Sequence, residues 1–533
     1  MSLLHRVVLP ALTVVGLGFL IACSSSNNNT PPPSGGFSNT DFNGTYTFSS
    51  SGSDSNGALS IAGTITACGC SNGQITAGTV DLADSSGATG PVTITATGSG
   101  YKVNANGTGT FTVSLPLNPT VQYQFAFVLT DAAHGLLSEY DQNGTGSGTI
   151  DLQPSAVTLS NTSYAFSLSG AASSSSAGTL PLGTDGGFTL NSSGGITAGL
   201  ADFNFGGTPS AGLTLSGAVS TGTGTAPGTA TLSSSFATLT FDVYAIDATH
   251  LKFIENDSKA VLVGDVFSQP TATIPSGTLA FTMAGLDSSS SPMGLAGTVA
   301  SDGSSTLSNG SVDVNDAGTV DGGTNPPTPA SFSGTFVAQP GSNTNGRFFV
   351  DLSNFPGGTD FAAYPSSGGV LMLEIDSGLG AGVTSGVALT QNSPAGLVAS
   401  QGYGMNLTGA SESGELDQIA QFNTTSTKAS GQLYQNNSGT PTSNSFSGTI
   451  TAGTGGGGQI IFNGNSEGAF YYGVDSATSL ALGIDSSDVS LGLFQQQGSP
   501  SSTADVAQRH LAMIKAAAKA RANKKKKAAA VAK

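Results

Sequence analysis

The sequence contains no tryptophan and is poor in charge, histidine and cysteine. Charged residues make up 9% of its 533 residues, whereas they make up roughly 25% of an average globular protein. There are four histidines and three cysteines, and away from the two ends of the chain the histidines are His134 and His250. No Gly-x-Ser-x-Gly elbow therefore has a credible histidine partner, which argues against a hydrolase triad. We predict a protein that is not an enzyme and that needs no cofactor.

The sequence is rich in apolar residues and in glycine. Hydrophobic residues account for 37% of the chain, and 76 residues are glycine. A disordered chain would be poor in apolar residues and rich in charge, so this composition indicates folded material. Serine, threonine, asparagine and glycine replace charged residues on its surface. The composition favours an extracytoplasmic β protein.

The few charges are divided unevenly along the chain. The formal net charge is −17. Residues 503–533, however, hold nine of the fifteen lysines and arginines and one acid, Asp505, so this tail carries +8. The body before it keeps five cations against 31 acids. Such a body repels nucleic acid and anionic lipid, which excludes it as a phosphate-backbone binder, whereas the tail alone could bind an anionic partner.

The N-terminus has the features of a secretory signal. Arg6 precedes Val7–Ala22, sixteen residues without charge, and a membrane-spanning helix needs about 20 apolar residues. Leu20-Ile21-Ala22-Cys23 resembles a bacterial lipobox, in which the cysteine becomes the lipidated first residue of the mature lipoprotein. The resemblance implies export and anchoring through acyl chains such as palmitate on Cys23. Ser24, rather than aspartate, is similar to lipoproteins sent to the outer membrane.

Four repeats follow a polar, proline-rich tether. Each repeat opens with an aromatic residue or leucine, then Phe or Met, then Gly, as in Tyr46/Phe48/Gly52. A second signature is Ile75–Asp81 in the first copy, and an acidic strand end closes each copy. The three signatures recur in one order, which indicates tandem domains, and the fourth copy matches least well. Each copy runs to a terminal glutamine: Gln153, Gln269, Gln391 and Gln497.

These signatures predict the domain boundaries. We expect a signal peptide at 1–22, the lipidated cysteine and tether at 23–38, β repeats at 39–153, 154–269, 270–391 and 392–497, and a basic tail at 498–533.

Each repeat has the pattern of an antiparallel β meander. Within the run Val121–Thr130, the residues Val121–Phe127 alternate apolar with polar, which is the period of a half-buried strand. Turn sequences such as Ser-Asn-Gly separate about eight such runs per copy. A meander of this size must close or pair face to face to remove its edges. We predict an all-β fold of four small barrels, with a β-sandwich as the alternative, followed by a C-terminal basic helix.

One strand carries a family resemblance. Gly44-Thr45-Tyr46-Thr47-Phe48 is similar to the opening strand of lipocalin-type and avidin-type barrels, which implies a barrel. The tryptophan that those families usually carry in this strand is absent.

A histidine and two carboxylates recur at one spacing in the first two copies. The sets could be metal ligands or an acid/base pair. The competing interpretation is structural, because Asp131 and Asp247 stand where aspartate caps a turn and the third and fourth copies lack the histidine. We favour the structural interpretation of these candidate metal ligands: His134, Glu139, Asp141, His250, Glu255 and Asp257.

If Cys23 is lipidated, the remaining cysteines are Cys68 and Cys70. In an oxidising compartment they could form a small disulfide, and a strained, exposed disulfide could have a redox role. The plainer interpretation is a bond that only staples a local loop, or two thiols with no role.

The tail predicts a helix with an anionic partner. Ser502 can cap a helix over Val506–Asn523, which lacks a strong apolar stripe, so membrane insertion is not expected. Its partner could be an acidic envelope polymer, lipid headgroups, nucleic acid or the acidic body itself, and the alternative is a solvated tail. The basic residues of the tail used in this argument are Arg509, Lys515, Lys519, Arg521, Lys524, Lys525, Lys526 and Lys527.

The sequence thus predicts a lipid-anchored envelope protein with a structural, adhesive or passive binding role. A second hypothesis is small-ligand or glycan binding in the barrel mouths, and a third is a metal-dependent enzyme that uses the histidine–carboxylate sets. With four barrels in a row, the chain would reach on the order of 140 Å and carry its tail far from the lipid.

Overall fold

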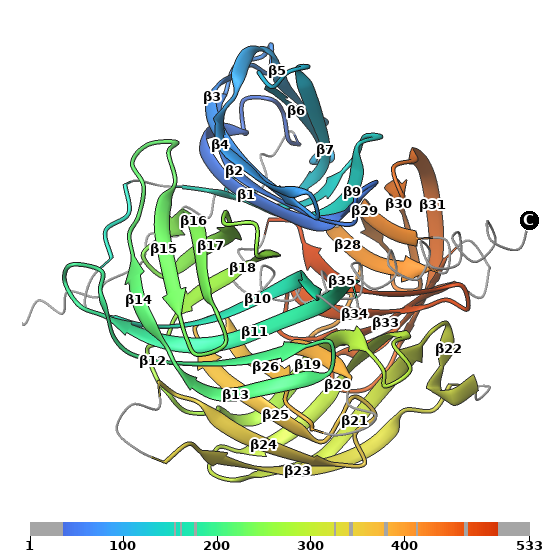
Figure 1. Ribbon diagram of the computed structural model, residues 1–533. Coiled ribbons are helices and arrows are strands. Elements are labelled where there is room, and N and C mark those ends of the chain that lie inside the picture. Colours follow the sequence, from blue (N-terminus) through green and yellow to red (C-terminus); the bar gives the residue numbers. More distant parts are fainter. Residues whose placement is uncertain are drawn as a thin grey trace, which may run out of the picture.

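The computed structural model describes residues 36–153, 156–159, 162–174, 178–323, 327–340, 345–377, 382–411, 414–462 and 467–498. This part of the chain forms four consecutive antiparallel β sheets (Figure 1). The predicted all-β fold of four tandem barrels is therefore confirmed. The signal peptide, Cys23 and the predicted C-terminal basic helix lie outside the described residues. Within the described part, no helix is long and apolar enough to cross a membrane.

Barrel 1 is a nine-stranded sheet whose two ends come back together. Neighbouring strands follow the order β4-β3-β2-β1-β9-β8-β7-β6-β5, and a bridge joins Gln74, just before β3, to Gly100 of β5. The strands are β1 (Asn43–Asp54), β2 (Ala58–Cys68), β3 (Ile75–Asp84), β4 (Gly87–Thr93), β5 (Thr95–Val103), β6 (Thr108–Leu115), β7 (Val121–Leu129), β8 (His134–Glu139) and β9 (Gly144–Leu152).

Barrel 2 repeats this arrangement. Its order is β13-β12-β11-β10-β18-β17-β16-β15-β14, and a bridge from Gly195 to Ala218 joins the two ends in the same way. The strands are β10 (Ser163–Ser174), β11 (Gly178–Leu190), β12 (Ile196–Phe205), β13 (Thr208–Thr214), β14 (Ser216–Val219), β15 (Gly228–Ser233), β16 (Thr238–Asp247), β17 (His250–Glu255) and β18 (Ala260–Ser268).

Barrel 3 closes through pairing of β20 with β21, which in turn pairs with β23. A short 3₁₀ turn, η1 (Asp321–Gly323), follows its smallest strand. The strands are β19 (Ser276–Leu286), β20 (Pro292–Asp302), β21 (Thr306–Asp316), β22 (Thr319–Val320), β23 (Ala330–Ala338), β24 (Phe348–Ser353), β25 (Asp360–Ser366), β26 (Gly369–Glu374) and β27 (Val383–Thr390).

Barrel 4 is a closed barrel of eight strands in sequence order. The repeat with the weakest signatures thus forms a complete barrel. Its strands are β28 (Gly402–Ser411), β29 (Gly414–Thr424), β30 (Lys428–Asn437), β31 (Pro441–Ala452), β32 (Gly457–Phe462), β33 (Gly468–Gly473), β34 (Thr478–Ile484) and β35 (Asp488–Gln496).

Successive side chains of a strand point alternately into the barrel and out of it, and in β7 both faces are buried. In β7, Phe125 and Phe127 belong to the aromatic core inside barrel 1. Ala126 and Val128 point the other way and join an apolar cluster with residues from the other barrels. Strands that are buried on both faces read as nearly continuous apolar runs, which explains the second half of β7, Phe125–Leu129, where every residue is buried. The outer faces of the barrels are therefore built for contact with neighbours.

The four barrels form a closed ring, in which the first barrel contacts both the second and the fourth (Figure 1). At each junction, the first two or three strands of one barrel pack against the last three strands of the next: β1–β3 against β16–β18, β10–β12 against β25–β27, β19–β21 against β33–β35, and β28–β29 against β7–β9. Because every junction uses the same two surfaces, the contacts are heterologous and the rotation closes after four copies.

The ring corrects the expectation of four barrels in a row. A row would leave these outer apolar faces exposed to water, and burying them is favourable at about 25 cal/mol per Å². One consequence is that the two ends of the described chain lie together. Phe37 and Gln497 both approach Gly107 in barrel 1, so the tail does not begin at an end remote from the tether.

Candidate functional site

The terminal glutamine of each repeat binds the next barrel around the ring. The side-chain amide of Gln153 donates to the carbonyl of Ala245 at 2.8 Å, and that of Gln497 closes the ring by donating to Leu129 at 2.9 Å. The other two amides make the matching bonds: Gln269 to Pro365 at 2.8 Å and Gln391 to Gly473 at 2.6 Å. The four accepting residues occupy the same position in their barrels. The repeated glutamine is therefore an inter-barrel contact.

A buried asparagine makes a second repeated contact at three of the four junctions. Asn436 of barrel 4 donates its side-chain amide to the carbonyls of Glu139, Asp141 and Gly144, at 2.9–3.2 Å, in the closing hairpin of barrel 1. Equivalent bonds run from Asn204 to Glu374 and Gly382, and from Asn315 to Gly483, Asp485 and Asp488.

We expect Asn436→Ala to lower the free energy of unfolding by about 1–3 kcal/mol, because it leaves buried carbonyls without a donor. Asn437→Ala is the matched control, since Asn437 is the adjacent residue and is exposed. Urea denaturation of both variants measures the difference. Equal stabilities would contradict the assigned role of Asn436.

The aspartate of the second sequence signature also faces the next barrel. The hydroxyl of Tyr244 in barrel 2 donates to Asp81 of barrel 1. In the next junction the hydroxyl of Tyr364 donates to Asp202 at 2.5 Å. Arg347 adds a bidentate pair to Asp202, at 2.7 and 2.8 Å, with both side chains buried. Asp202 is thus bound by two groups of barrel 3.

Burial changes the proton affinity of several of these carboxyl groups. It raises the pKa of Asp81 to about 7, and the neighbouring Asp242 adds to the rise, although the hydrogen bond from Tyr244 opposes it. Burial raises the pKa of Asp185 to about 8, with a further contribution from Asp202. A carboxyl that titrates near neutral pH is protonated at mildly acidic pH, so it can be buried without a full negative charge.

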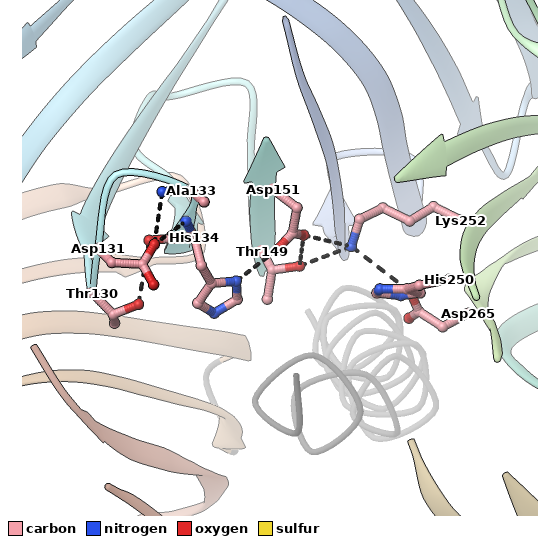
Figure 2. Close-up of polar contacts among 9 residues, drawn as sticks. All are labelled: Thr130, Asp131, Ala133, His134, Thr149, Asp151, His250, Lys252 and Asp265. Carbon is pink, nitrogen blue, oxygen red and sulfur yellow. Dashed lines mark hydrogen bonds and ion pairs between the residues drawn. The ribbon is translucent and has the colours of Figure 1, made fainter. Parts of the chain in front are cut away.

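The junction of barrels 1 and 2 also holds a cluster of ionisable side chains, which includes a buried lysine and two buried histidines (Figure 2). Lys252 extends from β17, and its Nζ lies 3.2 Å from Asp151 Oδ2 and 2.8 Å from Thr149 Oγ1, both on β9. Asp265 Oδ1 lies 3.7 Å from the same Nζ. Lys252 is fully buried. This lysine therefore joins two barrels through charge.

Both histidines of the body lie in the same cluster, each paired with a carboxylate. His134 Nδ1 is 2.6 Å from Asp151 Oδ1, and His250 Nε2 is 2.6 Å from Asp265 Oδ1 (Figure 2). Burial opposes ionisation of Asp151, but Lys252 and His134 together hold its pKa well below the usual range. We name these six residues the junction cluster: His134, Thr149, Asp151, His250, Lys252 and Asp265.

The structure separates the members of the two predicted metal sets. His134 begins β8 and Glu139 ends it, and five residues of strand span about 17 Å. His250 and Glu255 are separated in the same way along β17. Among the described residues, no group of three histidine, cysteine, aspartate or glutamate side chains is placed to hold a metal ion. The two sets are not brought together as ligand clusters.

The aspartates near these sets shape turns. Asp131 Oδ1 accepts the backbone N–H groups of Ala133 and His134, at 2.7 and 2.8 Å. Asp141 accepts the N–H groups of Gln124 and Asn143, and Asp257 accepts those of Thr240 and Lys259. Asp247 accepts the N–H of Thr249 at 2.6 Å. These contacts agree with the structural interpretation of the two sets.

Cys68 and Cys70 form a disulfide in the structure, with their Cα atoms 5.1 Å apart. The pair lies at the end of β2, and the Sγ of Cys68 is 3.7 Å from the hydroxyl of Tyr101. The bond closes a short loop that follows β2.

The barrel interiors are filled by side chains. Aromatic residues such as Phe48, Phe111 and Phe125 stack inside barrel 1, and the interior of barrel 3 keeps a cavity of about 30 Å³. That volume equals about one water molecule, so barrel 3 offers no room for a sugar or an apolar ligand. A larger cavity of about 310 Å³ lies between barrels 1 and 2, lined in part by Thr45, Thr64 and Gln153.

No family model matches this sequence, and no curated protein matches it. Solved structures that are similar include a double mutant of transferrin binding protein B from Haemophilus parasuis Hp5, at 10% identity, covering 68% of this chain and 83% of that chain, with a TM-score of 0.18. Intact Ap-TbpB, with its N and C lobes, is similar at 11% identity, covering 68% of this chain and 84% of that chain, with a TM-score of 0.18. Scores this low carry no inference about ligand or partner.

Proposed function

We propose that this protein is a lipid-anchored protein of the bacterial envelope that presents one rigid four-barrel body, in a structural, adhesive or passive binding role. The observation that carries the proposal is the closure of the ring. Each barrel holds a core of apolar side chains in its interior, and two flanks of its outer wall contact neighbouring barrels. The surface available to a partner is therefore the outer surface of the four-barrel ring.

The anchor half of the proposal is supported by the lipobox-like residues Leu20–Cys23 and the uncharged tether after them. A lipid at Cys23 and a polar tether suit a body held close to a membrane. We favour the outer membrane because Ser24 follows the cysteine.

The anchor is tested by Cys23→Ala expressed in a bacterial host with labelled palmitate. We expect the wild-type protein to carry label and to stay in the membrane pellet after a high-salt wash, because its acyl chains remain inserted. The variant should carry no label and leave the pellet. Ser24→Ala, which alters the next residue and keeps the thiol, should behave as wild type. An unlabelled wild-type protein, or a Cys23→Ala variant retained at high salt, would contradict the proposal.

A further inference from the structure

Lys252 is a buried lysine whose side chain extends from barrel 2 toward barrel 1. Its Nζ lies 3.2 Å from Oδ2 of Asp151 and 3.7 Å from Oδ1 of Asp265, and it donates to Oγ1 of Thr149 at 2.8 Å. The other three lysines of the described part are exposed: Lys102, Lys259 and Lys428. An amine and a carboxyl group are therefore in contact across the junction, close to the separation of about 3–3.5 Å at which neighbouring groups react.

The strands fix the positions of these groups. Lys252 on β17 is directly opposite Asp265 on β18, and His134 on β8 is directly opposite Asp151 on β9. Thr149 and Asp151 are two residues apart on β9, so both point to the same face. Lys252 and Thr149 have no exposed surface, and Asp151 is 5% exposed. The groups are thus held together and shielded from water, and both conditions raise the rate of a reaction between them.

We propose that Lys252 and Asp151 condense, once the ring has folded, to form an amide cross-link between barrels 1 and 2. An ammonium and a carboxylate become an amide and one water molecule, so no oxidant, reductant or cofactor is needed. The reaction removes two charges from a site where burial makes each charge costly. The ion pair between the two side chains is the state before condensation. The cross-link does not require the lipid anchor, because it joins two residues of the ring.

The contacts around Nζ supply a path for its protons. The hydroxyl of Thr149, 2.8 Å from Nζ and 3.1 Å from Asp151 Oδ2, relays one proton from the nitrogen to that oxygen, which leaves an amine beside a carboxylic acid. The nitrogen lone pair then attacks Cγ of Asp151 and forms the C–N bond. A second proton follows the same relay, and Oδ2 leaves as water when its bond to Cγ breaks. The third proton stays on the amide nitrogen.

Two further members of the junction cluster stabilise the reacting atoms. With a proton on Nδ1, His134 donates to Oδ1 of Asp151 at 2.6 Å. This oxygen carries negative charge in the tetrahedral intermediate and becomes the amide carbonyl. The carboxylate of Asp265 lies 3.7 Å from Nζ, where it stabilises the positive charge that the nitrogen gains during the attack. The amide closes a loop of about 100 residues, and a cross-link over so long a loop restricts the unfolded chain.

Trypsin digestion of the denatured full-length protein tests the cross-link directly. Trypsin binds a free, charged side chain before the bond that it cleaves, so an amide on Lys252 blocks cleavage there. Without the amide, cleavage after Lys252 and Lys259 releases segment 253–259. We expect the yield of 253–259 to be at least about tenfold below that of 260–347, the internal control. Segment 103–259 should be recovered uncut, with a mass lower than that of its sequence by one water molecule.

Three variants separate the reacting groups from a neighbouring ion pair. Asp151→Ala removes the carboxyl group, so segment 253–259 should appear in the same yield as 260–347. Asp265→Asn keeps the shape of the side chain without its charge and should raise the yield of 253–259 severalfold over the wild type. Asp257→Asn is the matched control, because Asp257 pairs with the exposed Lys259 at 2.8 Å. This variant should keep segment 103–259 uncut.

The digest of the wild-type protein decides the proposal whatever the stability of the variants. Equal yields of segments 253–259 and 260–347 would overturn it. An uncut segment 103–259 with the full mass of its sequence would also overturn it, because no water has been lost. If segment 260–347 is recovered attached to 103–259, the lysine has condensed with Asp265, and the assignment to Asp151 fails.

Discussion

Replacement of Lys252 by methionine is expected to lower the free energy of unfolding by about 3–5 kcal/mol, because it leaves two buried carboxylates without their cation. Asp151 and Asp265 stay in place, each with its histidine, in a site where Lys252 itself has no exposed surface. Methionine has a similar length, so the change removes charge with little loss of volume. Urea denaturation at pH 7, followed by circular dichroism, measures the effect.

Lys259→Met is the matched control for Lys252→Met. Lys259 also pairs with an aspartate, Asp257, at 2.8 Å, but its side chain is 53% exposed. Exposed ion pairs contribute about 0–1 kcal/mol, so this variant should denature near the wild-type midpoint. An equal decrease in the free energy of unfolding in the two lysine variants would contradict the claim that the junction cluster stabilises the contact between barrels 1 and 2.

The second large effect is a loss of stability as the pH rises from 5 to 9. Burial raises the pKa of six carboxyl groups to about 7 or higher: Asp81, Glu374 and Asp488 to about 7, Asp185 and Asp313 to about 8, and Glu255 to about 9. In the unfolded chain these groups titrate near pH 4. Between pH 4 and these raised values, the folded state binds more protons than the unfolded state, so the free energy of unfolding falls as the pH rises.

The expected loss is at least several kcal/mol, because six groups contribute and one unit of pKa shift corresponds to about 1.4 kcal/mol. The stabilisation is complete below about pH 4 and is lost as the pH passes through 7 to 9. Urea denaturation at pH 5, 7 and 9 measures it. Asp185→Asn keeps the shape and cannot ionise, so its stability should fall less steeply with pH than that of the wild type. A stability that is constant or increases over this range would show that these carboxyls are not held protonated.

Most of the fold could be predicted from the pattern of strands and from the spacing of the repeats. The alternation in Val121–Phe127 and the turn sequences between such runs are local signals, and local signals suffice to predict a meander. Some boundaries between strands carry no local signal: the run Val92–Ala96 reads as one strand but is divided between β4, which ends at Thr93, and β5, which begins at Thr95. Ile94 between them is buried in the core of barrel 1, and an apolar run with a bend inside it reads as one strand.

The closed ring of barrels was not predicted, although the sequence contains repeated residues that make the contacts between barrels. The terminal glutamines recur at one position, but a side-chain amide carries no information about its acceptor until the neighbouring barrel is placed. Asn204 and Asn315 each follow the second-signature aspartate by two residues, and this regularity could have indicated a repeated contact. The burial of Lys252 could not be predicted from the charge pattern, because Asp151 and Asp265 become its neighbours only when two barrels are packed together.

The closed ring is tested most directly by small-angle X-ray scattering of the protein without its signal and lipid. A compact body of about 460 residues has a radius of gyration near 23 Å, and the tether and tail raise this only to about 30 Å. Four barrels in a row, each about 35 Å across, would give about 40 Å. We predict a value below about 30 Å that does not change with ionic strength. A radius of gyration near 40 Å would contradict the ring.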